Sequence, residues 1–235
     1  MEQIGEHPGT RSGTNIKILS DEGQVRNVQT GISLQLQFDS VGLGSNSWAG
    51  LAHEIAHEMG LIDLYRYRPY EGESESAFSQ SFFRHFDLMF YPGRPAPELL
   101  AWNRWLLGFI EDSEVICLDV DHLGTVAVGP LQSSAQHRKM IVIRHSDSTA
   151  TIIEFRRALG YDIGLSLRTE GLVIYELNTQ WPTGHGAFGL VTKSGANSTD
   201  VADAIIRQGD SVTVSGFKIE NLDQSSDRVA VRITR

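Results

Sequence analysis

The segment Leu51–Asp63 restricts the fold of this chain more than any other stretch. It reads LAHEIAHEMGLID and contains HExxH, extended to HExxHxxGxxD. Residues four apart lie one turn apart on the same side of an α-helix, so His53 and His57 can direct two imidazoles at one metal ion. HExxH is the zinc-hydrolase signature, in which the intervening glutamate is the general base. We therefore predict a helix that carries His53 and His57 as zinc ligands and Glu54 as the base.

The residues around this motif also follow a helical period. On a wheel of about 100° per residue, an apolar stripe lies nearly opposite the two histidines, so we expect the stripe to be buried while the histidines face a cleft. The stripe consists of Trp48, Leu51, Ala52, Ile55, Ala56 and Met59. Asn46 or Ser47 can cap the start of the helix, and Gly60 stands where helices often end in a left-handed turn.

The same turn makes Asp63 the expected third ligand, because it would bring the chain back toward the metal. A carboxylate oxygen suits zinc, and three protein ligands leave a fourth position for water. The alternative is that Asp63 only caps the next turn, in which case its rivals are the glutamates of the acidic segment 71–76, namely Glu71, Glu73 and Glu75. We expect that segment to be an exposed loop, and calcium binding is a second interpretation of its acidity. The alternative for the whole motif is an exposed helix with two surface histidines and no metal.

Composition limits the classes of partner. The chain has 235 residues, 40% of them hydrophobic, and a net charge of −9, which disfavours nucleic acid or an anionic membrane because both need clustered Lys and Arg. No apolar run is long enough to span a bilayer, and Met1–Ser20 lacks the apolar core of a signal peptide. The single cysteine, Cys117, excludes an internal disulfide, and its apolar surroundings predict a buried, inert thiol.

The pattern of the chain changes near residue 111. Before that point we expect a short strand at 15–19, an alternating strand at 32–38, and a second helix from Pro97 to its end at Gly108. After it, short apolar runs separated by turn residues predict an antiparallel β-sandwich. These runs are 115–118, 125–128, 140–143, 151–155, 172–177, 211–214, 217–220 and 229–233. The expected fold class is α+β, with the HExxH helix in a module at 1–111 and the β-sandwich at 112–235.

Several segments, taken in order, share a pattern that goes beyond the zinc motif. They are HEIAHEMGLIDLY at 53–65, DLM at 87–89, PELLAWNRWLLG at 97–108, IEFR at 153–156 and GLVIY at 171–175. This ordered set resembles the immune inhibitor A family of secreted bacterial zinc metallopeptidases, which are relatives of the metzincins. The resemblance implies a zincin-like catalytic module with zinc on His53, His57 and Asp63, Glu54 as base, secretion, and protein or peptide substrates.

The resemblance also implies roles for two residues after the acidic segment. Met89 would form an apolar turn beneath the metal, and the Tyr91 hydroxyl would stabilise the tetrahedral oxyanion, with a packing role as its alternative. Phe86 stands where the family has tryptophan. Only 52 residues precede His53, so the N-terminal sheet of the catalytic module is expected to be reduced.

These observations predict a zinc-dependent endopeptidase that hydrolyses peptide bonds with a metal-activated water and Glu54 as general base. Two alternatives stay open. One is a catalytically inactive protein with a vestigial zinc site that acts as a binding or adhesion module through its β-sandwich. The other is a zinc hydrolase for an ester or a cell-wall amide, which HExxH alone does not exclude.

Overall fold

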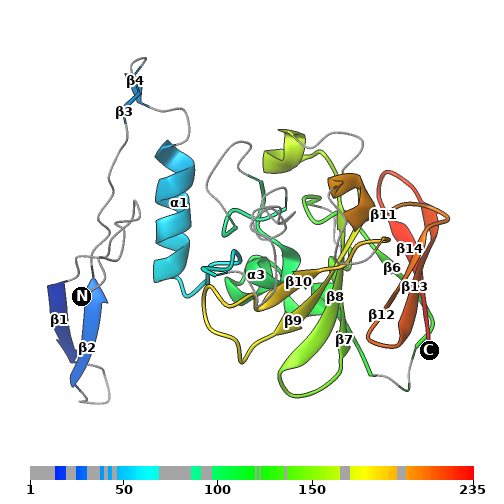
Figure 1. Ribbon diagram of the computed structural model, residues 1–235, viewed down its shortest axis with the longest axis horizontal. Coiled ribbons are helices and arrows are strands. Elements are labelled where there is room, and N and C mark those ends of the chain that lie inside the picture. Colours follow the sequence, from blue (N-terminus) through cyan, green and yellow to red (C-terminus); the bar gives the residue numbers. More distant parts are fainter. Residues whose placement is uncertain are drawn as a thin grey trace. The chain divides into compact units, whose positions relative to one another are not determined.

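The fold is taken from a computed structural model of the chain (Figure 1). The structure describes residues 14–19, 25–30, 38–39, 42–43, 47–68, 86–90, 97–119, 121, 123–134, 137–164, 170–194 and 200–235. The chain divides into two compact units, Met1–Gly60 and Leu61–Arg235. The domain boundary placed after residue 111 stays a prediction.

The described residues of the first unit form two small antiparallel strand pairs and one helix. Strand β1 (Thr14–Leu19) pairs with β2 (Val25–Thr30), and β3 (Phe38–Asp39) pairs with β4 (Gly42–Leu43). Helix α1 spans Ser47–Glu58. The helix and the strand at 15–19 are thus confirmed, whereas β2 was not predicted. The alternating strand expected at 32–38 lies outside the described residues except for its last position.

The exposure of α1 differs from the expected stripe. Ala56 is buried and His53 is only 3% exposed, whereas Leu51, Ile55 and Met59 are 39%, 42% and 52% exposed. These three side chains follow a spacing of four, so they form one ridge along the helix. The expectation that the whole apolar stripe is buried is therefore wrong. A hydrophobic period identifies a face of a helix, but it carries no information about what covers that face.

The second unit is built on two β-sheets (Figure 1). The larger sheet has the order β10-β9-β8-β7-β5, with β11 also paired to β9. Its strands are β5 (Val115–Leu118), β7 (Met140–Arg144), β8 (Thr149–Arg156), β9 (Gly171–Asn178), β10 (Phe188–Leu190) and β11 (Ile205–Ile206). One pair, β5 with β7, is parallel, which corrects the expectation of a wholly antiparallel sandwich. The reason is that β6, between them in sequence, belongs to the other sheet.

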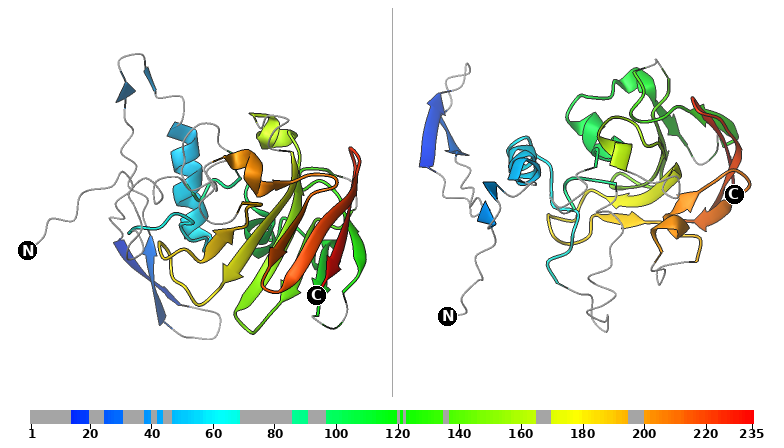
Figure 2. Two further views of the ribbon diagram at one scale, coloured as in Figure 1. Left: turned by 45° about the vertical axis from the view of Figure 1, so that its right-hand side comes forward. Right: turned by 90° about the horizontal axis from the view of Figure 1, so that it is seen from above.

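The smaller sheet has the order β12-β13-β14-β6, and all of its pairs are antiparallel. Its strands are β6 (Thr125–Val128), β12 (Ser211–Val214), β13 (Phe217–Gln224) and β14 (Val229–Thr234). Figure 2 shows this sheet, mostly orange to red, beside the green and yellow strands of the larger one. A shared cluster of buried side chains, including Ile153 and Ile174 of the larger sheet and Ile219 and Ile233 of the smaller, joins the two sheets. The β region is thus sandwich-like, held mainly by apolar burial.

Helix α3 (Ala101–Leu106) packs in the same unit and begins later than expected. The sequence predicts a start at Pro97, but residues 97–100 are not helical. The backbone N–H groups of Glu98 and Leu100 donate to the carboxylates of Asp162 and Asp87. Gly108 has a φ of 75°, the left-handed turn expected at the helix end. The described residues also include the short 3₁₀ helices η2 (Asp112–Glu114), η3 (Gly160–Gly164) and η5 (Val201–Ala204).

Cys117 is exposed, which contradicts the expected buried thiol. It lies on β5, which is at the edge of the larger sheet. Val115, two residues earlier, is 7% exposed, so burial along this strand does not follow strict alternation. An apolar run at a sheet edge can therefore leave one of its members in solvent. Within the part of the chain that the structure describes, no helix is long and apolar enough to cross a membrane.

Candidate metal centre

Helix α1 brings the two histidines of the motif together. The Nε2 atoms of His53 and His57 are 3.1 Å apart, and their ring centroids are 4.7 Å apart. Two imidazole nitrogens on a tetrahedral zinc, each about 2.0–2.1 Å from it, would lie about 3.4 Å apart. Small side-chain rotations therefore suffice to let both nitrogens bind one ion. Glu54, between them in sequence, is partly exposed on the same helix.

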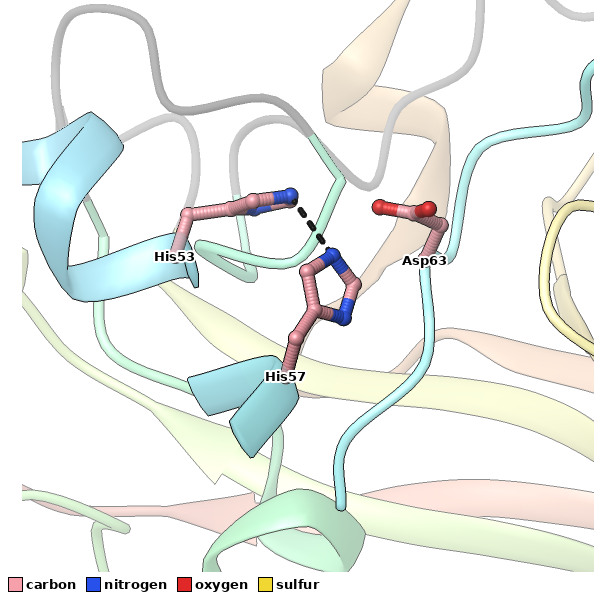
Figure 3. Close-up of side chains that lie close together, drawn as sticks. All are labelled: His53, His57 and Asp63. Atoms are coloured by element: carbon pink, nitrogen blue, oxygen red, sulfur yellow. Dashed lines mark hydrogen bonds between the residues drawn. The ribbon is translucent and has the colours of Figure 1, made fainter. Parts of the chain in front are cut away.

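Gly60 follows the helix with a φ of 101°, as expected for a left-handed helix end. Asp63 comes three residues later and is 5% exposed. His53, His57 and Asp63 each offer one ligand atom, and these atoms lie within 4.8 Å of one another. Figure 3 shows the two imidazoles and the carboxylate converging. Two imidazoles and a carboxylate are donors that divalent transition metals accept, so this group can hold a metal ion.

Asp63 is held by hydrogen bonds from within the second unit. Its Oδ2 accepts hydrogen bonds from the Tyr67 hydroxyl and from Thr183 Oγ1, the latter at 3.3 Å. The backbone N–H of Asp63 donates to the same Thr183 Oγ1 at 3.0 Å. Thr183 lies 120 residues further along the chain, in the connection between β9 and β10. One hydroxyl thus fixes both the backbone and the side chain of the predicted third ligand.

The turn at 86–90 supports the residue after Asp63. The N–H of Leu64 donates to the carbonyl of Met89 at 3.0 Å, and the Met89 side chain is fully buried. Asp87 fixes this turn, because its Oδ1 accepts from the Met89 N–H and its Oδ2 from the Leu100 N–H, both at 2.6 Å. Met89 therefore lies beside the segment that carries Asp63. Its role as an apolar floor beneath a metal stays a prediction.

A buried ionic cluster anchors the segment that leads into α3. Arg156 on β8 is fully buried and pairs with Glu154 at 3.0 Å and Asp162 at 2.7 Å. Its guanidinium also donates to the carbonyl of Leu99 at 3.2 Å. Glu154 in turn accepts from the N–H of Ala101 at 2.6 Å. These bonds satisfy backbone groups at the start of α3 that would otherwise be buried without partners.

Burial controls the ionisation of this cluster. It raises the pKa of Asp87 to about 6, although hydrogen bonds from Leu100, Met89 and Asn103 act in the opposite direction. Burial also raises the pKa of Glu154, against the nearby charge of Arg156. Burial by itself would lower the pKa of Arg156, but the charges of Asp162 and Glu154 outweigh it, and the pKa is raised. Arg156 is therefore the fixed positive charge of the cluster.

The structure brings together some of the predicted site residues and leaves others untested. His53, His57 and Asp63 converge, whereas Tyr91 and the glutamates Glu71, Glu73 and Glu75 lie outside the described residues. Sequence reasoning missed Tyr67 and Thr183. Tyr67 is four residues after Asp63, but no motif singles it out. Thr183 gives no sequence signal at all, because its contact with Asp63 depends on the path of the whole β region.

A cavity lies in the second unit, apart from the predicted metal ligands. The cavity has a volume of about 770 Å³, and its lining includes Glu176, Asn178, Trp181, Phe217 and Arg235. Trp181 is 43% exposed, and the guanidinium carbon of Arg235 lies 5.9 Å from the centre of the Phe217 ring. Aromatic walls with a few polar groups are typical of small-ligand sites.

Comparison with known proteins adds no assignment to these two sites. No protein-family model matches the chain, and searches of curated proteins and of solved structures found no match either.

Proposed function

We propose that this protein is a zinc-dependent endopeptidase with His53, His57 and Asp63 as metal ligands. The observation that carries the proposal is the ligand group itself, whose donor atoms lie within 4.8 Å of one another. Two histidines and one carboxylate leave a coordination position for water, as catalytic zinc sites require. The ordered resemblance to the immune inhibitor A family supports peptide bonds as the substrate and secretion as the setting.

Glu54 and Tyr91 have separate roles in the proposed mechanism. Zinc, when bound, supplies Lewis acidity and a water of lowered pKa. Glu54 follows His53 directly on α1 and would accept the proton of the attacking water, then deliver it to the leaving amine. Its partial exposure is compatible with contact to water and substrate. Tyr91 remains the proposed donor to the oxyanion.

The same segments that carry the resemblance contact one another in the second unit. Asp87 of the DLM segment binds Leu100, and Glu154 of the IEFR segment accepts from Ala101 and, at 3.1 Å, from the hydroxyl of Tyr175. These segments therefore form one buried framework, which contacts the Asp63 segment through the bond between Leu64 and Met89. The contacts among these segments support the proposal that the chain belongs to the immune inhibitor A family, because the segments that carry the resemblance also pack together.

The proposal is tested by zinc stoichiometry and casein cleavage on wild type, Glu54→Gln and Glu58→Gln. Glu58 is an exposed glutamate at the last position of the same helix, which makes it a matched control. We expect one zinc per chain in all three proteins and a loss of cleavage of at least about 100-fold in Glu54→Gln alone. No zinc in the wild type, or equal activity in Glu54→Gln, would contradict the proposal. Iron in place of zinc would contradict the metal, since two histidines and a carboxylate also suit iron(II).

The second candidate function is a binding module with an inactive metal site. The observation that favours it is the cavity of about 770 Å³ with its exposed Trp181. One zinc per chain without turnover of peptide, ester or glycan substrates would support this candidate. Binding of a substrate from that panel that is weakened in Trp181→Ala would then place the function in the cavity.

A further inference from the structure

The connection between β9 and β10 reaches the Asp63 segment at two points. Thr183 bonds to Asp63 as described above, and the carbonyl of Gly184 accepts the N–H of Tyr67 at 3.0 Å. The base of this connection is closed, because the N–H of Asn178 donates to the carbonyl of Ala187 at 2.8 Å. The tip is thus tied to the larger sheet at one end and to the segment 63–67 at the other.

Three oxygen atoms meet at this contact. The Tyr67 hydroxyl bonds to Asp63 Oδ2 and lies 3.3 Å from Thr183 Oγ1, which itself donates to Oδ2. A carboxylate has about four acceptor positions, so two hydroxyl donors do not exhaust its capacity for a metal. Ligating carboxylates in metal sites are commonly oriented by such hydrogen bonds. The contact therefore has the form of an orienting shell around a metal ligand.

The backbone of the connection is adapted to this close approach. Gly184 has a φ of 73°, and a Cβ built on it would lie 2.3 Å from Cδ2 of the Tyr67 ring. Any other residue here would adopt a strained backbone and displace the ring. A glycine at this point allows the tip to lie against Tyr67.

We infer that Thr183 and Tyr67 are positioning residues that orient Asp63 for metal binding. This inference rests on the proposed function for the identity of Asp63 as a ligand. It gives the β region a part in the metal centre, because the connection that supplies Thr183 is held by strands β9 and β10. The sequence leaves open whether that region supports the site or holds substrate, and the Thr183 contact favours support.

The inference is tested by zinc affinity, measured by competition with a chromophoric chelator, in Thr183→Val, Thr183→Ser, Tyr67→Phe and Thr179→Val. Valine keeps the shape of threonine without its hydroxyl, whereas serine keeps the hydroxyl. Thr179 is a matched control in the same connection, where its hydroxyl donates to the Ser148 carbonyl at 3.3 Å. We expect Thr183→Val and Tyr67→Phe to bind zinc about 10- to 100-fold more weakly. Thr183→Ser and Thr179→Val should bind as the wild type does.

A second readout needs no metal. Hydrogen exchange of the Asp63 amide in the metal-free protein should be faster in Thr183→Val than in Thr183→Ser, because only valine removes the acceptor. Wild-type affinity in Thr183→Val would overturn the positioning role while leaving the proposed function intact. Equal loss in Thr183→Val and Thr179→Val would also overturn it, because general damage to the connection would then explain the effect. A wild type that binds no zinc would overturn both proposals.

Discussion

His53 and His57 lie on one helix, four residues apart, and the approach of their imidazoles follows from helix geometry. Asp63 lies outside any helix or strand, and its carboxylate is held by Tyr67 and by Thr183, which follows 120 residues later. One part of the ligand group therefore depends on local sequence and the other on the folding of the β region. Changes far from the motif should disturb Asp63 while leaving the helical pair intact.

The non-local support of Asp63 extends well beyond its immediate partners. Leu64 bonds to Met89, whose turn is fixed by Asp87, and Asp87 bonds to Leu100 at the start of α3. Arg156 on β8 then holds the neighbouring carbonyl groups and the two acids beside it. By contrast, helix α1 exposes the apolar side chains of Leu51, Ile55 and Met59 to solvent.

Arg156→Met should lower the free energy of unfolding by about 3–5 kcal/mol, because it leaves Glu154 and Asp162 buried without their cation. Urea unfolding measures this effect. Arg232→Met is the matched control, since Arg232 bonds to Glu220 on the surface at 2.8 Å, and its unfolding midpoint should stay near that of the wild type. A midpoint for Arg156→Met equal to that of the control would contradict the anchoring role of the buried cluster.

Asp87 should make the protein less stable as the pH rises through the acid range. Its pKa is about 6 in the folded chain against an ordinary pKa of 3.8 for an aspartate in the unfolded chain, so the folded state holds a proton that the unfolded state has released. The stabilisation is complete below about pH 3.8 and is lost by about pH 6, a change of about 3 kcal/mol.

Carbon NMR of the Asp87 carboxyl group measures this titration directly. Asp227 is the control, because a hydrogen bond from Ser225 lowers its pKa. A midpoint for Asp87 at or below that of Asp227 would show that its hydrogen bonds outweigh burial, and the pH dependence would then have the opposite sign.

Gly184→Ala should reduce stability by about 1–2 kcal/mol through backbone strain and should also weaken zinc binding by displacing Tyr67. Gly209→Ala separates the two effects. Gly209 has a φ of 85°, but a Cβ there would meet nothing within 4 Å. It should lose similar stability while keeping wild-type zinc affinity. Equal zinc affinity in the two variants would contradict a role for the Gly184–Tyr67 contact at the metal centre.

Local patterns predicted the helical half of the site and much of the β region. The spacing of His53 and His57 predicted helix α1, and Gly60 predicted where it ends. The bounds of β5, β6 and β12 agree with those of the predicted apolar runs. These features depend on backbone periodicity and turn preference, which neighbouring residues determine.

Features that depend on distant contacts were missed or wrong. The sequence did not predict the hydrogen bonds of Thr183 and Tyr67 to Asp63. It also predicted a buried Cys117, which is exposed, and did not predict the parallel pairing of β5 with β7. The short strands β10 and β11 were missed because two or three residues give no period to read. The contacts of Thr183 and Tyr67, the exposure of Cys117 and the pairing of β5 depend on which distant segments become neighbours, and the local pattern of one sequence does not contain that information.

The assignment of His53, His57 and Asp63 as zinc ligands is tested most directly by X-ray absorption at the zinc edge, on the wild type and Asp63→Ala. We predict a four-coordinate ion with two imidazole nitrogens and oxygen ligands, all at about 2.0–2.2 Å. Asp63→Ala should keep both imidazoles and lose the carboxylate oxygen. A wild-type spectrum without imidazole scattering, or one unchanged by the Asp63 substitution, would contradict the site.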